Sequence, residues 1–249
     1  MNQQAETKLY KVEIIAFTIE ACSLIEQAGA NRIELCANPT EGGTTPSYGF
    51  IKRAREAVTI SLFPIIRPRG GDFLYTNAEY GLMQDDVRLC RQLGCDGVVI
   101  GLLQKDGSID VRRTAKLVEM AYPMEVTFHR AFDHCRDPFE ALEQLTAIGC
   151  QRILTSGQKP VAPEGADLLA ELVKAAADRI IIMPGSGVRP DNIAELAEKT
   201  GAAEFHSSLR TLSPSGMEYL HPSFHTSKEK YAHTTTDAAA IRQLIENLK

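Results

Sequence analysis

Short runs of β-branched and other apolar residues alternate along the chain with longer segments whose apolar residues recur every three or four positions. Short apolar runs are typical of buried strands, and the longer spacing is typical of amphipathic helices. The runs predict eight strands, at residues 12–17, 32–36, 62–67, 97–101, 125–129, 152–156, 180–183 and 203–208. This alternation indicates an α/β protein built from repeated strand–helix units.

The helical segments carry signals at both ends. Helices are predicted within residues 18–29, 137–149 and 191–201, and a last one in DAAAIRQLIENLK at the C-terminus. Each of the first three begins at a short polar side chain that can cap a helix, and each stops at a glycine. The predicted N-caps are Thr18, Asp137 and Asp191.

Eight units in 249 residues correspond to about 31 residues each, which suits a βαβ repeat. Eight repeats favour a closed (β/α)8 TIM barrel in a single domain over residues 1–249. The alternative is an open doubly wound sheet, but AFTIEA after the first strand does not match the G-x-G-x-x-G pattern of that fold. Residues 1–9 are predicted to be a polar N-terminal tail, and residues 213–236 a long loop before the last helix.

Composition narrows the range of partners and compartments. The net charge of −5 and the pI of about 5.7 argue against nucleic acid or an anionic membrane as a partner. No apolar run approaches the ~20 residues that span a bilayer, and the polar start MNQQAETKLYK does not resemble a secretory leader. The expected location is the cytoplasm, where the six scattered cysteines are expected to be reduced thiols.

Polar residues gather on one side of the predicted barrel. The connections after strands 2, 3, 5, 6, 7 and 8 contain the polar, glycine-rich or charged segments CANPTEGGTTPS, PRGGDFLY, HRAFD, TSGQK, PGSGVRP and HSSLR. The connections at the opposite ends, such as GANR and IGCQR, are short and plain. Because TIM barrels carry their active sites at the C-terminal ends of the strands, this asymmetry predicts a site there.

The segments PGSGVRP and EFHSSLR, at the ends of strands 7 and 8, match a common phosphate-binding position of this fold. Glycines let backbone N–H groups approach an anion, and serines add donors. We therefore favour an anion site over two capped turns. The residues predicted to form it are Gly185, Gly187, His206, Ser207 and Ser208.

Several arginines are expected at the same rim. Arg67, Arg69, Arg130 and Arg210 could bind a carboxylate or phosphate group of a small anionic ligand. The alternative is that they form ion pairs with carboxylates of the protein, and the two interpretations are evenly balanced. The carboxylates expected nearby are Glu13, Glu34, Asp72 and Asp133.

Two glutamates and two histidines are expected to meet at the barrel mouth. Glu13 and Glu34 lie within strands 1 and 2, whereas His129 and His206 end strands 5 and 8. The set could act as acid and base, or hold a divalent metal. A charge-paired polar layer with Arg67 is favoured slightly over metal binding. The catalytic candidates are His129, Glu34, Asp133 and Glu13.

Five segments together resemble the copper homeostasis protein CutC family. They are GANRIELC followed by EGGTTPS, IIRPRGGDFLY, VTFHRAFD, RILTSGQ, and GSGV followed by EFHSS. The resemblance runs from about Val12 to the C-terminal helix. It implies a (β/α)8 barrel, a cytoplasmic location, a homo-oligomer (dimer or tetramer) and a role in copper tolerance with Cu(I) binding.

The resemblance carries over unevenly to the metal ligands. Cys36 matches the cysteine that ends strand 2 in the family, but Ile15 stands where many members have a strand-1 cysteine. Cu(I) prefers two or more soft ligands. A second ligand would have to come from Cys22, Cys135, Met183, a histidine or another subunit.

Two functional hypotheses follow. The resemblance implies a copper-homeostasis protein that binds Cu(I) through Cys36. The density of polar residues at the mouth instead favours an enzyme of unknown reaction that acts on a small anionic metabolite, for example a phosphorylated one. The residues alone favour the second hypothesis, and the fold cannot decide between the two because it hosts many unrelated functions.

Overall fold

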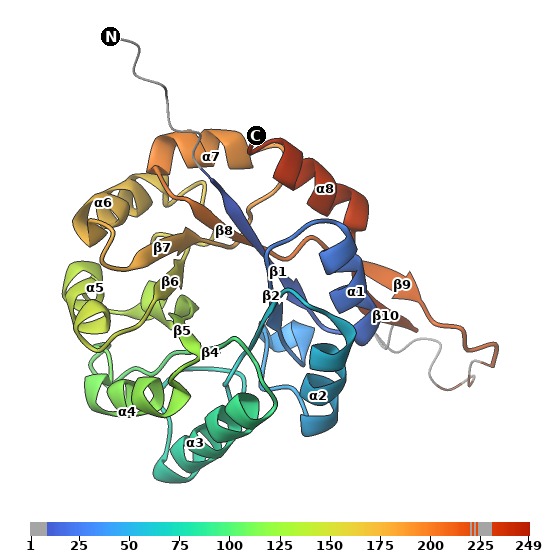
Figure 1. Cartoon of the computed structure of the whole chain (residues 1–249), viewed down its shortest axis with the longest axis horizontal. Coiled ribbons are helices and arrows are strands. Elements are labelled where there is room, and N and C mark those ends of the chain that lie inside the picture. The colour runs from blue at the N-terminus through green and yellow to red at the C-terminus, as the bar shows by residue number, and fades with distance from the viewer. Residues whose placement is uncertain (1–8, 220, 222, 224–230) are drawn as a thin grey trace.

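Eight parallel strands lie inside a ring of helices in the computed structural model (Figure 1), which describes residues 9–219, 221, 223 and 231–249. This arrangement confirms the predicted (β/α)8 barrel, while the predicted polar tail lies outside the described residues except for Leu9. No described helix is long and apolar enough to cross a membrane. The elements in chain order are β1 (Lys11–Ala16), α1 (Ile19–Gln27), β2 (Arg32–Leu35), the 3-10 helix η1 (Pro39–Glu41), α2 (Tyr48–Ala57), β3 (Ser61–Pro64), α3 (Asn77–Gln92), β4 (Gly97–Ile100), α4 (Val111–Ala121), β5 (Glu125–Phe128), the 3-10 helix η2 (Arg130–His134), α5 (Pro138–Ala147), β6 (Arg152–Thr155), α6 (Ala166–Ala176), β7 (Ile181–Pro184), α7 (Ile193–Thr200), β8 (Glu204–Ser207), β9 (Arg210–Pro214), β10 (Ala232–Thr236) and α8 (Ala238–Glu246).

The ladder of the barrel divides into two four-stranded parallel sheets, β3-β2-β1-β8 and β4-β5-β6-β7. At the seam between β3 and β4, Ile65 and Val99 form an isolated bridge. Each seam also has a proline, Pro64 on β3 and Pro184 on β7. The next N–H groups, of Ile65 and Gly185, donate to β2 and β6, so the prolines face the seams. Proline has no N–H to donate, which accounts for the interrupted ladder.

Alternation along the strands separates an apolar outside from a polar inside. Ile14, Ile33 and Phe128 belong to the large core between the strands and the helices. Their neighbours in sequence point into the barrel, where Ile15, Cys36, Phe63, Ile65 and Val99 form a small apolar cluster. The other inward positions include buried charged side chains, of which Glu13, Arg32, Glu34, Arg152 and Glu204 are examples. This polar interior determines the chemistry of the site.

Helix caps follow the sequence signals in two of the three predicted cases. The Thr18 side chain accepts from the N–H of Ala21, and Asp137 accepts from two N–H groups of α5, so both caps are confirmed. The predicted cap at Asp191 is wrong, because α7 begins after Asn192. The Asn192 side chain accepts from the N–H of Arg189 and donates to a carbonyl of the loop after β7. It therefore fixes that loop to the start of the helix.

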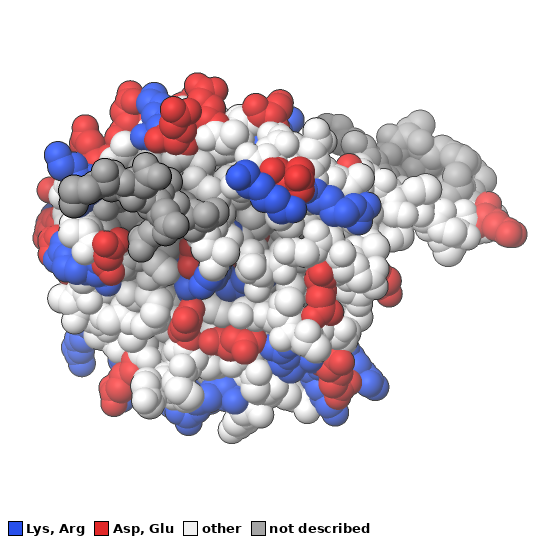
Figure 2. Space-filling view, turned by 45° about the horizontal axis from the view of Figure 1, so that its top comes forward, with Lys and Arg blue, Asp and Glu red and all other residues white. Residues whose placement is uncertain are grey.

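The predicted loop at 213–236 is wrong at both ends. β9 pairs with β10 in an antiparallel ribbon, with Thr211 opposite Thr235 and Leu212 opposite Thr234. Threonine favours strands because its β-branched side chain fits a pleated surface. The ribbon projects from the barrel as an arm (Figures 1 and 2), and residues 220, 222 and 224–230 of the connection lie outside the described residues.

Two glycines of the barrel interior make space for aromatic neighbours. A Cβ at Gly97 would lie 2.4 Å from the ring of Phe63, and a Cβ at Gly101 would lie 2.2 Å from the ring of His129. Phe63 is almost fully buried and packs between the guanidinium groups of Arg32 and Arg152, 5.1 and 5.4 Å from its centroid. It therefore has no free space into which it could move.

We expect Gly97→Ala to lower the free energy of unfolding by about 1–3 kcal/mol, because overpacking would displace Phe63. A matched control is Gly81→Ala, on the surface of α3, where an added Cβ meets no atom within 4 Å. That variant should be neutral or more stable by up to about 1 kcal/mol, since alanine favours a helix. Urea unfolding measures both values, and an equal effect of the two changes would contradict the packing argument.

Candidate functional site

A cavity of about 310 Å³ opens at the barrel mouth, on the face that the sequence predicts. Its apolar wall consists of Ile15, Phe17, Ile65, Phe73 and Leu154. Its polar side chains are Glu34, Arg67, His129, Arg130, Ser186, His206, Ser208 and Arg210. A concave site with a few convergent polar groups is the usual form of a small-molecule site.

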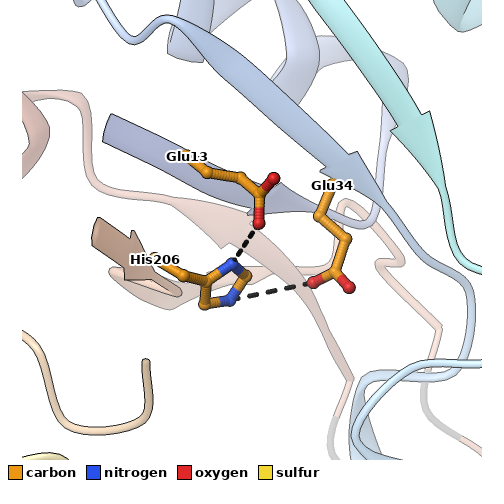
Figure 3. A group of neighbouring side chains, drawn as sticks. All are labelled: Glu13, Glu34 and His206. Atoms are coloured by element: carbon orange, nitrogen blue, oxygen red, sulfur yellow. Dashed lines mark hydrogen bonds and ion pairs between the residues drawn. The ribbon is translucent and has the colours of Figure 1, made fainter. Parts of the chain in front are cut away.

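Glu13, His206 and Glu34 form a row beside this cavity (Figure 3). The Nδ1 atom of His206 lies 2.7 Å from a Glu13 oxygen, and its Nε2 atom lies 3.7 Å from a Glu34 oxygen. Strand register brings them together, because Glu13 is the partner of His206 between β1 and β8. Glu13 is 1% exposed and Glu34 is 3% exposed, so solvent screens this row little.

Below this row, the floor of the barrel is a chain of alternating charges. Arg32 forms an ion pair with Glu13 and another with Glu204, the latter at 2.7 Å. Arg152 continues the chain, with contacts of 3.0 Å to Glu204 and 2.7 Å to Glu125. Each buried charge in the floor therefore has a partner, which offsets the cost of removing it from water.

The two glutamates have opposite protonation preferences. Burial alone would raise the pKa of Glu13, but the charge of Arg32 and the hydrogen bond with His206 hold this pKa at about 2. Burial raises the pKa of Glu34 to about 7, because the attraction of His206 only partly offsets burial. Burial would lower the pKa of His206, but the hydrogen bond with Glu13 and the charge of Glu34 raise it instead. Pairs of titratable groups with separated pKa values are typical of acid–base sites.

His129 is held as a neutral ring on another wall. Its Nδ1 atom accepts a hydrogen bond from the N–H of Ala131 at 3.0 Å, so the ring proton is on Nε2. Burial, together with the nearby charge of Arg67, lowers the pKa of His129 to about 3. The Nε2 atom is buried without an acceptor among the described residues.

Arg67 is fixed at the mouth by backbone groups. Its two terminal nitrogens donate to the carbonyls of Glu41, Gly43 and Gly71 at 2.6, 3.0 and 2.8 Å. The sequence left open whether Arg67 binds a ligand or forms an ion pair. The structure shows a third arrangement, in which backbone carbonyls hold its guanidinium group. Its positive charge is not neutralised by a carboxylate among the described residues.

The predicted anion-binding residues divide into two groups. Arg67, Arg130, Gly187, His206 and Ser208 line the cavity, as does Arg210. The N–H groups of Gly187 and Ser208 have no acceptor within the described part of the chain. Three predicted residues do not line it: Gly185, Ser207 and Arg69.

The three exceptions have simple geometric causes. Ser207 follows the inward His206, so its side chain points outward and donates to the carbonyl of Val188 at 2.6 Å. Arg69 turns away to pair with Asp72 and Glu79. Gly185 is packed beneath the mouth, where an added Cβ would lie 2.4 Å from Leu154.

Asp133 does not line the cavity but organises the loop after β6. It accepts hydrogen bonds from the hydroxyls of Thr155 at 2.5 Å and Ser156 at 2.9 Å, and from the N–H of Ser156 at 2.9 Å. Arg130 also pairs with it at 2.7 Å. Its oxygens are therefore occupied, and the structure gives this catalytic candidate a positioning role.

Cys36 is poorly suited to hold Cu(I) as the residues stand. The thiol is fully buried, and burial together with the neighbouring Glu34 raises its pKa well above the usual value. Among the described residues, the cluster with ligand atoms within 4.8 Å of one another is Glu13, Glu34 and His206, which excludes Cys36. Oxygen and imidazole donors do not match the preference of Cu(I) for sulfur.

The other soft ligands considered from the sequence lie elsewhere. The Cys22 thiol donates to the carbonyl of Thr18 at 3.3 Å on α1, and Met183 accepts from Arg32 at 3.2 Å in the floor. The Cys135 thiol contacts the side-chain amide of Gln158. None of them completes a site around Cys36.

Sequence reasoning missed the charged floor and, among the polar side chains of the cavity, Ser186. Arg32 and Glu204 were detectable, because R-x-E-x-C at 32–36 and E-x-H at 204–206 repeat polar residues at the two-residue period of one strand face. Arg152 begins RILT on β6, where no such repeat marks it. Ser186 lines the cavity with a positive φ of 73°. That orientation depends on the turn, for which the sequence contains no clear signal.

Comparisons with known proteins agree on one family. The model of the CutC family matches residues 10–211. A CutC family protein of Chromobacterium violaceum is 50% identical over 240 residues, which cover 95% of this chain and 97% of that protein. One of Parabacteroides distasonis is 56% identical over 209 residues, which cover 84% and 86%.

Solved structures agree with the fold. A CutC protein of Streptococcus agalactiae, named for copper homeostasis, matches with a TM-score of 0.77 and 33% identity, covering 80% of this chain and 99% of that chain. Phosphoribosyl anthranilate isomerase of Thermotoga maritima matches with a TM-score of 0.59 and 14% identity, covering 96% and 98%. The second likeness shows the fold alone.

We expect Glu34→Gln to flatten the dependence of stability on pH. A carboxyl whose folded pKa is raised stabilises the fold fully below its unfolded pKa of 4.5, and this is lost as the pH rises through about 7. The free energy of unfolding should therefore fall less between pH 5 and pH 8 in the variant, by up to about 3 kcal/mol. Urea unfolding at both pH values measures this, with Glu195→Gln on the surface of α7 as the control. Identical pH dependence in Glu34→Gln and wild type would contradict the raised pKa.

Proposed function

The chain belongs to the CutC family, and from this premise we propose that its barrel mouth binds a small anionic metabolite and transforms it by acid–base chemistry. The observation that carries the proposal is the row Glu13–His206–Glu34 beside the mouth cavity, with pKa values of about 2 and about 7 for the two glutamates. Buried carboxylates with such different affinities for protons are typical of catalysis.

One end of the cavity is suited to an anionic group. The N–H groups of Gly187 and Ser208 have no acceptor among the described residues and belong to loops at the usual phosphate position of this fold. Arg210 adds positive charge there, although one of its nitrogens also donates to the carbonyl of Pro39. Backbone N–H groups together with an arginine are a common means of binding phosphate or carboxylate.

The other polar wall is suited to proton transfer. Glu13 stays ionised beneath His206 and orients its ring, so Nε2 of His206 faces Glu34. Glu34 has a pKa near neutrality, which lets it accept or donate a proton at physiological pH. Glu13 is then a positioning residue, whereas Glu34 and His206 are the proposed catalytic residues.

Location, oligomeric state and partners are proposed from the family and the composition. A cytoplasmic location and a homo-oligomer, as dimer or tetramer, are proposed from the resemblance. Acidic and basic side chains are interspersed on the face shown in Figure 2, which supports the proposal that nucleic acid is not a partner.

A second candidate function is Cu(I) binding with Cys36 as a ligand. It is favoured by the name of the Streptococcus agalactiae relative and by the position of Cys36 next to Glu34 below the mouth. Against it stand the raised pKa of the thiol and the position of Ile15, where a second sulfur would be needed.

We expect inorganic phosphate, or a member of a panel of phosphorylated sugars and acids, to raise the melting temperature, since a ligand that binds only the native state stabilises it. Arg210→Gln should weaken that ligand about tenfold, because a charge-assisted hydrogen bond is lost. The control Arg189→Gln removes the same charge from the loop after β7 but lies outside the cavity. If the whole panel left wild type unshifted, the anionic-metabolite proposal would be abandoned.

For the copper candidate, we expect Cys36→Ser to abolish Cu(I) binding in competition with a strong chelator, while Cys150→Ser retains it. Cys150 is also a buried thiol but lies at the opposite end of the barrel, before β6. A titration of each variant gives stoichiometry and affinity. Unchanged binding in Cys36→Ser would remove this candidate.

A further inference from the structure

His129 lines the mouth cavity and carries a buried hydrogen-bond donor that has no acceptor among the described residues. The N–H of Ala131 donates to Nδ1 at 3.0 Å, so the ring proton is on Nε2, which has no acceptor among the described residues. His129 is 4% exposed and lines the mouth cavity. An unsatisfied buried donor costs about 1–3 kcal/mol, so such a group is expected to meet an acceptor on a ligand.

The surroundings of His129 favour an acceptor that gains negative charge. The ring of Phe73 lies 5.0 Å from the His129 ring, and the Arg67 guanidinium lies 5.1 Å from the Phe73 centroid. Arg67 and His129 therefore share one wall of the cavity, and backbone carbonyls already hold the arginine in place. A neutral N–H donor beside a fixed positive charge can stabilise an oxygen whose charge develops during a reaction.

Glu34 is the proton acceptor that would complement the His129 donor. It lies on β2, whereas His129 follows β5. Among the described residues, it is the carboxylate that lines the cavity. Glu13 and Glu204 are engaged by arginines, and Asp133 by five donor groups. The nearest cation to Glu34 is instead His206, at 3.7 Å. Glu34 also has a hydrogen bond with the Cys36 thiol, but no arginine pairs with it among the described residues, which suits it to act as a base toward a bound molecule.

We propose that this site enolises an anionic α-hydroxycarbonyl compound, such as a sugar phosphate, with Glu34 as the base and His129 as the donor to the carbonyl oxygen. This inference rests on the proposed function and specifies its reaction class. The Glu34 carboxylate removes a proton from the carbon next to the carbonyl. The electron pair of that C–H bond forms a carbon–carbon double bond, and the π pair of the carbonyl moves onto oxygen.

The resulting enediolate oxygen accepts a hydrogen bond from Nε2–H of His129 and lies in the field of Arg67. If the proton on Glu34 first exchanges with solvent, its return to the same carbon gives hydrogen exchange. Its delivery to the neighbouring carbon gives isomerisation when the hydroxyl proton of the enediolate moves to the other oxygen. The step needs neither an oxidant nor a reductant. The anionic group of the substrate would bind at Gly187, Ser208 and Arg210, as in the proposed function.

The test is deuterium incorporation from D₂O, followed by proton NMR, into dihydroxyacetone phosphate, ribulose 5-phosphate and fructose 6-phosphate. Wild type should incorporate deuterium next to the carbonyl faster than buffer alone. Glu34→Gln should reduce this rate about 10²–10⁴-fold, as expected for loss of a general base. His129→Gln should reduce it about 10²-fold or more while the probe still raises the melting temperature, since a transition-state donor is lost.

Glu34→Asp controls for a loss of activity that is caused by misfolding. It retains the carboxylate but shortens the side chain by one methylene, which moves the carboxylate away from the substrate. It should keep the fold and still lose most of the exchange, whereas Glu195→Gln should exchange like wild type. Full exchange in both Glu34 variants would overturn the inference. Exchange into none of the three probes, with the Arg210-dependent thermal shift intact, would overturn enolisation and leave anion binding standing. Loss of both signals would overturn both proposals.

Discussion

Arg32 lies between Glu13 and Glu204 inside the barrel, and the arrangement of the site depends on this pairing. A lone charge in such a place costs several kcal/mol, so each charged group fixes the next. Arg32 keeps Glu13 ionised, Glu13 holds Nδ1 of His206, and His206 then faces Glu34 with Nε2. Removing Arg32 would leave Glu13 with His206 as its remaining ionic partner among the described residues, and Glu204 with Arg152 and Lys11.

The pairing is complete at the floor and incomplete at the mouth. Arg152 and Glu204 have ionic partners, whereas Nε2 of His129 and the N–H groups of Gly187 and Ser208 have no acceptor among the described residues. Gly187 and Ser208 are exposed, so water can bind their N–H groups, whereas the His129 donor is buried. All three groups lie at the end of the barrel where this fold carries its active sites.

Spacing along the chain was sufficient to predict the barrel, because eight apolar runs separated by amphipathic segments have few other solutions. The polar loops after the strands also predicted correctly the end of the barrel at which the cavity opens. Strict alternation could also have excluded Ser207, since it follows the inward His206. The role of Asp133 and the carbonyl shell of Arg67 depend on the three-dimensional course of loops, and no local pattern encodes them. For the same reason, α7 begins after Asn192 rather than after Asp191. The ribbon of β9 and β10 was missed because its two strands are separated by a long connection.

The two proline seams divide the residues of the proposed site as well as the hydrogen-bond ladder. Glu13, Glu34 and His206 belong to the sheet β3-β2-β1-β8, whereas His129 follows a strand of the sheet β4-β5-β6-β7. A slight shift of one half-barrel against the other would change the gap between base and donor while the ladder within each half stays intact. The bridge between Ile65 and Val99 joins the two halves at one seam, so the proposed base and donor belong to halves that meet there.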